Sequence, residues 1–187
     1  MRIRSSSRSF FFLSFMVCTM AVYPSGSLAQ GAGPGVKEAY YRAVGEHFTV
    51  SEEEVAIIGE WELVPDEVPV VLFLAKRAGV SPDALIGLSR RGQPWREVAS
   101  RYGLHSQAFH LPLPQGADLG VLTRVYEEFR RLPPMEWSQI LLDDQEVIAL
   151  VNLRVLSEHT GVPPERVLLS FDEAGSFMAA YPLLLGR

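Results

Sequence analysis

The sequence predicts an all-α protein made of two related three-helix, helix-turn-helix-like units that pack as one domain. Apolar residues recur at the helical spacings of three and four, and no useful stretch alternates between apolar and polar residues as a half-buried strand would. Six anchor residues form three pairs, each separated by 82 positions: Gly79 and Gly161, Pro82 and Pro164, and Trp95 and Phe177. A helical corner and an aromatic residue that return at one fixed distance indicate an internal duplication.

Residues 1–29 have the pattern of a secretory signal peptide. A basic start is followed by an apolar run from Phe10 to Tyr23 and by a small-residue site at Ser27–Ala29. The apolar run is shorter than the roughly 20 residues that a membrane-spanning helix needs. We therefore expect cleavage after Ala29, a secreted or periplasmic protein, and no membrane span in the mature chain. Cleavage would also remove Cys18, the single cysteine, so we expect neither a disulfide nor a cysteine-bound metal.

The charge balance makes nucleic acid an unsuitable partner. The chain has 17 Lys and Arg against 22 Asp and Glu, a net charge of −5. Three of the cations lie within residues 1–29, so cleavage would leave about 14 against 22. A surface of this sign repels the phosphate backbone of nucleic acids and anionic membranes.

Beyond the signal peptide, four segments are expected. They are a flexible tail at 30–35, an N-terminal helical part with the first repeat unit at 36–110, a Pro-rich linker at 111–117, and a C-terminal helical part with the second unit at 118–187. The linker contains alternating prolines, which favour an extended chain over a helix.

Local signals predict where several helices begin and what they bury. Ser51 and Glu54 have the spacing of a capping box, and Asp66 is expected to cap the helix that follows it. Residues 70–75 of that helix are apolar almost all round, which places the helix at the centre of the core. In the second half, Asp118 and either Asp143 or Asp144 are expected to cap helices.

One locally basic surface stands out on the acidic chain. It comprises Arg90, Arg91, Arg96 and Arg101, with Lys76 and Arg77 nearby. Two interpretations remain open: a solvated helix face, or a docking patch for an acidic partner or for the other repeat unit.

DNA binding is an alternative suggested by one helical corner. Ala75, Gly79 and Leu85 have the spacing of a helix-turn-helix motif. These residues serve the packing of any such corner, however, and the following helix offers few side chains that read bases or contact phosphates. We therefore expect no nucleic-acid partner.

No catalytic residue, metal ligand or cofactor is assigned from the sequence. His105 and His110 are five positions apart, which suits neither a helix nor a strand for shared ligation, and His159 lies where a helix C-terminus would favour its charge. The chain contains no Gly-x-Ser-x-Gly or His-Glu-x-x-His motif. A hydrolase is kept only as an alternative function.

Residues 92–104 resemble the first helix of the LysM domain, a module that binds peptidoglycan or chitin. The similarity lies in Gly92, Trp95, Tyr102 and Gly103, although the tryptophan comes one position early and no flanking strands are visible. The resemblance implies binding of a cell-wall glycan as another alternative.

Over most of the mature chain, the sequence resembles a group of secreted bacterial all-helical proteins of unknown function. The residues that carry this resemblance are 68–82, the Gly-x-x-Trp turn and 151–159. It supplies no activity and no site residues. The expected function is therefore an exported binding or scaffold module of the periplasm or cell envelope, with an envelope protein or a cell-wall glycan as its partner.

Overall fold

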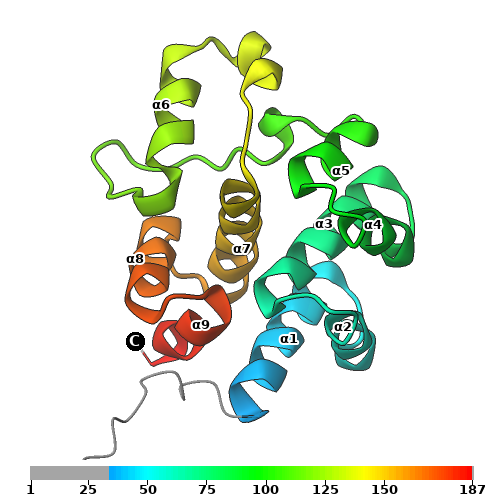
Figure 1. The fold of residues 1–187 in the computed structure, drawn as a ribbon. Helices are drawn as coiled ribbons and strands as arrows, with labels where there is room; N and C mark the ends of the chain where they lie inside the picture. Colours follow the sequence, from blue (N-terminus) through cyan, green and yellow to red (C-terminus); the bar gives the residue numbers. More distant parts are fainter. Residues whose placement is uncertain (1–33, 187) are drawn as a thin grey trace, which may run out of the picture.

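The computed structural model describes residues 34–186, which form helices and the segments that connect them (Figure 1). The predicted all-α class is confirmed. The expected signal peptide at 1–29 and residues 30–33 of the expected tail lie outside the described residues. Within residues 34–186, no helix is both long enough and apolar enough to cross a membrane.

Short 3₁₀ turns separate several of the α-helices. In chain order the elements are α1 (Pro34–Phe48), α2 (Glu52–Gly59), η1 (Pro65–Glu67), α3 (Val68–Ala78), α4 (Pro82–Ser89), α5 (Trp95–Arg101), η2 (Ser106–Ala108), η3 (Gly120–Leu122), α6 (Thr123–Arg131), η4 (Pro134–Gln139), α7 (Asp144–Thr160), α8 (Pro164–Ala174) and α9 (Phe177–Leu185). The first helix begins at Pro34, two residues before the expected start, because a proline at the first helical position gives up an amide that has no partner there. The expected linker at 111–117 contains no helix.

The repeated anchors occupy the same places in two sets of helices, α3–α4–α5 and α7–α8–α9. Gly79 and Gly161 end α3 and α7 in the left-handed conformation, with φ of 67° and 70°, and Pro82 and Pro164 open α4 and α8. Trp95 and Phe177 are the first residues of α5 and α9, and each is 1% exposed. Residues that are 82 positions apart in the sequence thus hold equivalent positions in α3 and α7, in α4 and α8, and in α5 and α9.

The helices α3 and α7 form the centre of the core and pack against each other. Every residue from Val68 to Leu74 is buried, as are most residues of α7 between Glu146 and Leu156. A helix that is apolar on all sides has to be surrounded by other elements. Accordingly, α3 also contacts α1, α2 and α4, while α7 also contacts α1, α5, α8 and α9. Figure 1 shows α7 between α8 on one side and α3, α4 and α5 on the other.

A chain of buried hydrogen bonds joins elements that are far apart in the sequence. Asn152, fully buried in α7, accepts a hydrogen bond from the Tyr40 hydroxyl of α1. Its amide nitrogen donates to the carbonyl oxygens of Asp66 and Ile148, both at 2.8 Å. Because every member of this chain has a partner, the polar groups are accommodated in the core without a large desolvation cost.

The expectation that Asp66 caps the next helix is wrong. Its carboxylate accepts hydrogen bonds from the backbone N–H groups of Phe177 at 2.8 Å and Met178 at 2.9 Å, and so caps α9 instead. The reason is that η1 runs directly into α3, where the Val68 amide already donates to the Pro65 carbonyl. The first turn of α3 therefore leaves the Asp66 side chain free to reach α9.

Candidate functional site

A groove of about 190 Å³ lies between α5, η2 and the segment that follows η4. Its apolar lining comes from Leu104, Phe109, Ile140, Leu141 and Leu142, and its polar lining from Arg96, Glu97, Ser100, His105, Ser106 and Ser138. Leu141 at the groove is 72% exposed, and Met135 in the adjacent η4 is 87% exposed. Large exposed apolar side chains beside an apolar hollow are typical of protein interaction surfaces.

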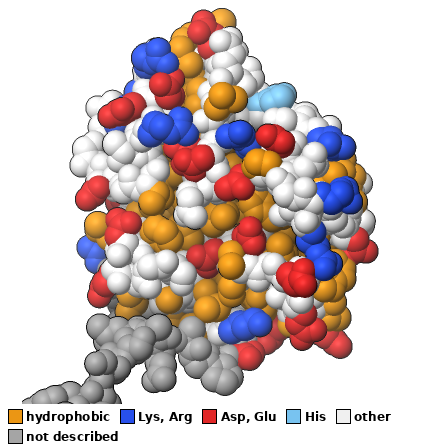
Figure 2. Space-filling view, in the orientation of Figure 1, with side chains coloured by type: hydrophobic (Ala, Val, Ile, Leu, Met, Phe, Trp, Pro, Cys, Tyr) orange, Lys and Arg blue, Asp and Glu red, His pale blue; other side chains and the backbone are white. Residues whose placement is uncertain are grey.

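The four arginines of the predicted basic surface are all exposed: Arg90 and Arg91 lie at the corner between α4 and α5, and Arg96 and Arg101 lie on α5. Figure 2 shows Lys and Arg side chains along the side of the molecule that holds these helices. The structure does not bring all four to one cavity. Arg96 lines the groove, whereas Arg90 forms an ion pair of 2.8 Å with Glu62 and borders a separate hollow. Arg91 and Arg101 form no ion pair with any described residue.

The groove brings His105 together with three serines, Ser100, Ser106 and Ser138, a grouping that the sequence did not reveal. The Ser106 hydroxyl donates to the carbonyl oxygen of Trp137. Within the described part of the chain, no hydrogen bond joins His105 to a serine. A serine nucleophile is activated by such a bond to a base.

The LysM-like stretch lies in and around α5. Its Trp95 is buried, and the indole Nε1 donates to Glu67 Oε1 at 2.9 Å. The described residues on either side of α5 form turns and helices. The tryptophan therefore packs in the core and does not offer its ring to a glycan.

His110 lies in an aromatic cluster with Tyr126, Phe129 and Trp137. The centroid of its ring is 4.3 Å from that of Trp137, 4.8 Å from that of Phe129 and 5.9 Å from that of Tyr126. Burial, together with the positive charge of Arg154, lowers the pKa of His110. This histidine is therefore a neutral packing residue near neutral pH.

The lowered pKa values of two histidines lead us to expect that the free energy of unfolding depends on pH. Burial also lowers the pKa of His47, with Glu158 opposing the shift. Below the usual histidine pKa of about 6.5, the unfolded chain binds protons that folded His47 and His110 do not, so the free energy of unfolding is expected to decrease as the pH falls. The stabilisation is fully present above that pH. Urea denaturation at a series of pH values measures this effect.

A His110→Phe variant, which keeps an aromatic ring in the cluster, isolates the contribution of His110 to this effect. The free energy of unfolding of His110→Phe is expected to depend less on pH than that of the parent protein. Burial raises the pKa values of Asp66 and Glu146, so both carboxyls act in the opposite direction at lower pH. Both carboxyls are present in His110→Phe and in the parent protein, so they do not affect the comparison. If the free energy of unfolding of His110→Phe depended on pH as strongly as that of the parent protein, the prediction would be contradicted.

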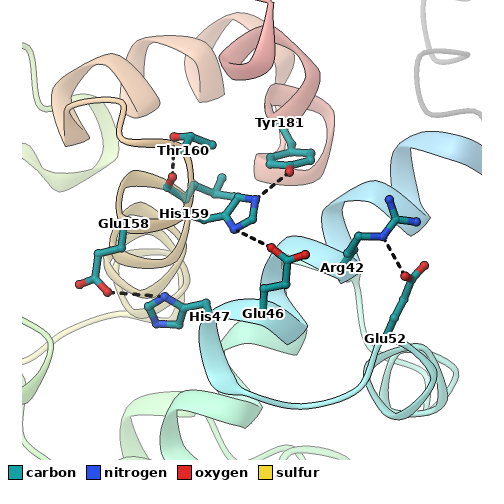
Figure 3. A network of polar contacts seen from close by, with 9 residues as sticks. Arg42, Glu46, His47, Glu52, Glu158, His159, Thr160 and Tyr181 are labelled. Atoms are coloured by element: carbon teal, nitrogen blue, oxygen red, sulfur yellow. Dashed lines mark hydrogen bonds and ion pairs between the residues drawn. The ribbon is translucent and has the colours of Figure 1, made fainter.

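Two reciprocal Glu–His pairs join the C-terminal ends of α1 and α7 (Figure 3). His47 Nδ1 is 3.5 Å from Glu158 Oε2, and His159 Nδ1 is 3.5 Å from Glu46 Oε2. His159 Nε2 is also 3.1 Å from the Tyr181 hydroxyl of α9. His159 does lie in the last turn of its helix, as expected, but the sequence did not reveal the pairing because its partners come from distant segments.

Next to the His47–Glu158 pair lies a second cavity, of about 200 Å³, between α1, α3 and α7. Its lining residues are His47, Phe48, Phe73, Lys76, Arg77, Arg154 and Glu158. Lys76 and Arg77 thus face this cavity and not the groove beside α5. This second cavity is referred to below as the cationic cavity.

Comparison with protein-family models, with curated proteins and with solved structures found no match. In residues 34–186, no group of three or more His, Cys, Asp or Glu side chains has an arrangement that would hold a metal ion.

Proposed function

We propose that this protein is an exported binding module of the cell envelope that docks an acidic protein partner in the groove between α5 and η4. The observation that carries the proposal is the combination, at one place, of an apolar floor, an exposed Leu141 and an exposed arginine, Arg96, on the rim. The partner is expected to offer an apolar side chain flanked by carboxylates.

The apolar part of the groove supports the docking of a side chain. Phe109, Ile140 and Leu142 are buried, so they give the floor a fixed shape, whereas Leu141 remains free to be covered by a partner. Covering an exposed leucine removes apolar area from water, at about 25 cal/mol per Å². This gain in free energy favours binding of the partner at Leu141.

The charge of the neighbouring helix supports the choice of an acidic partner. Among residues 34–186, Arg96 forms an ion pair with Glu97 alone, at 3.8 Å, and both side chains are exposed. Arg101, later in the same helix, is exposed and has no ion pair with a described residue. Positive charge at the rim would speed association with an acidic segment and would select against basic ones.

A site-specific photo-crosslinker tests the proposal. Placed at Leu141 in the full chain in cells, it is expected to capture a protein in the envelope fraction, with the attachment site in a segment rich in Asp and Glu. Arg96→Glu should abolish capture because it reverses the charge of the rim. Recovery of the adduct from the envelope fraction tests export in the same experiment.

The matched controls lie on α8, away from the groove. Leu169 is exposed as Leu141 is, and Arg166 is exposed as Arg96 is. A crosslinker at Leu169 should not capture the same protein, and Arg166→Glu should not prevent capture from Leu141. Equal capture from both leucines, or equal loss with both arginine variants, would refute the docking site.

A further inference from the structure

The cationic cavity is separate from the groove, and its central residue is Arg154. This arginine is half-buried in α7 and donates through Nη2 to the carbonyl oxygens of Phe109 at 3.2 Å and His110 at 2.9 Å. Its Nε–H is buried without a hydrogen-bond partner among the described residues. The guanidinium carbon lies 5.7 Å from the centroid of the Phe73 ring. Arg154 is thus a fixed cation that no carboxylate pairs with directly in residues 34–186.

Two further cations face the same space from α3. The Arg77 guanidinium carbon is 5.1 Å from the centroid of Phe73, so Arg77 and Arg154 both lie over this one ring. Lys76 Nζ is 5.9 Å from the centroid of Phe48. The aromatic faces hold the long side chains over the cavity and reduce the entropy that they would lose on binding an anion.

The charges at the cavity do not balance. Lys76, Arg77 and Arg154 contribute three positive charges, and Glu158 is the one carboxylate in the lining. Glu158 also lies 3.5 Å from His47 and is therefore shared with that histidine. Two positive charges are left without a counter-charge, in a protein whose overall charge is negative.

Compensation of helix dipoles explains part of this cluster. Lys76, Arg77 and His47 lie in the last turns of α3 and α1, where cations stabilise a helix. The dipole of α7 does not explain Arg154, which lies well before the end of that helix and is half-buried. Its Nε–H is also left without a hydrogen-bond partner among the described residues. Bringing Arg154 close to Arg77 costs electrostatic energy, which an anion between them would recover.

We propose that the cationic cavity binds a phosphate group, with Lys76, Arg77 and Arg154 as its ligands. Guanidinium forks match the oxygens of a phosphate, and two uncompensated positive charges match its charge of about −1.5 to −2 as a monoester near neutral pH. A cavity of about 200 Å³ is smaller than most sites for whole organic ligands, which are about 300 to 1,000 Å³. It therefore accommodates the phosphate itself, either free or at the end of a larger molecule that extends into solvent.

Isothermal titration calorimetry of the full chain at low ionic strength tests the proposal with three probes: inorganic phosphate, glycerol 3-phosphate and acetate. Both phosphates are expected to bind more tightly than acetate, because acetate has a single charge. Tighter binding of inorganic phosphate would identify the free ion as the ligand, and tighter binding of glycerol 3-phosphate would identify a phosphomonoester. Acetate binding as tightly as both phosphates, or no phosphate binding, would overturn the proposal.

Variants with opposite expected effects separate binding from folding. The double variant Lys76→Gln/Arg77→Gln should weaken phosphate binding about tenfold or more. Glu158→Gln removes the competing carboxylate and should tighten binding several-fold, a gain that loss of folding cannot produce. The matched control is Arg130→Gln/Arg131→Gln, which removes an adjacent pair of cations from the last turn of α6. Equal weakening by the control pair, or no tightening in Glu158→Gln, would refute the site.

Discussion

Replacing Trp95 with alanine is expected to lower the free energy of unfolding by about 4 kcal/mol, as is usual for large aromatic residues in a core. Trp95 is 1% exposed and begins α5, so the change leaves a cavity at the corner between α4 and α5. It also removes the hydrogen bond from the indole Nε1 to Glu67 Oε1. Urea denaturation followed by far-ultraviolet circular dichroism measures the loss.

Three further variants show whether the loss comes from packing. Trp95→Phe keeps an aromatic ring but loses the hydrogen bond, and is expected to cost about 1 to 2 kcal/mol. Phe177→Ala, at the equivalent place in the second unit, should cost nearly as much as Trp95→Ala. Trp61→Ala should cost less, because Trp61 is only half-buried. A loss in Trp95→Ala no greater than in Trp61→Ala would contradict a central role for Trp95.

Replacing Asp66 with alanine is expected to cost about 3 kcal/mol and to loosen a helix more than 100 positions away in the sequence. The change removes two charge-assisted hydrogen bonds to the amides of Phe177 and Met178, and it removes a negative charge from the N-terminus of α9. Hydrogen exchange in 177–185 should become faster than in the parent protein, because α9 loses its cap.

Asp143→Ala provides the matched control for a local cap. The Asp143 carboxylate accepts from the Glu146 amide at 2.8 Å, within the same helix start. Its replacement is expected to cost about 1 kcal/mol and to speed exchange at the beginning of α7, but not in 177–185. Unchanged exchange of 177–185 in Asp66→Ala would show that the contact does not hold α9 in place.

The glycine and proline corners were predicted correctly from the sequence because they depend on a few adjacent residues, whereas several expected caps were not: Asp118, for example, accepts from the Gly120 amide but is not the N-cap of η3 or α6. Gly79 and Gly161 end their helices, and Pro82 and Pro164 open the next ones, since φ preferences act within one residue. The capping box expected at Ser51 is only half formed: Ser51 accepts from the Glu54 amide, but no bond returns from the Glu54 side chain among the described residues. A complete box forms at Asp143 and Glu146 instead.

The cations of the predicted basic surface are close in sequence but lie at different cavities in the structure. Four arginines within twelve positions suggested one patch, yet Arg90 and Arg96 border different hollows because Arg90 follows the end of α4 and Arg96 lies in α5. Lys76 and Arg77, which the sequence groups with them, face Arg154 of α7 in another cavity. Proximity along the chain does not decide which side of a helical corner a side chain occupies.

The sequence alone determined the helical class, the positions of the main corners and the central place of α3, because apolar periodicity and backbone preferences are local properties. Only the tertiary structure decided that Asp66 caps α9, that Asn152 joins three segments, and that Arg154 meets Arg77 over Phe73. Each of these contacts joins residues from separate helices. Their positions follow from how α1, α3 and α7 pack, and that packing is the sum of many weak contacts that no single stretch of sequence encodes.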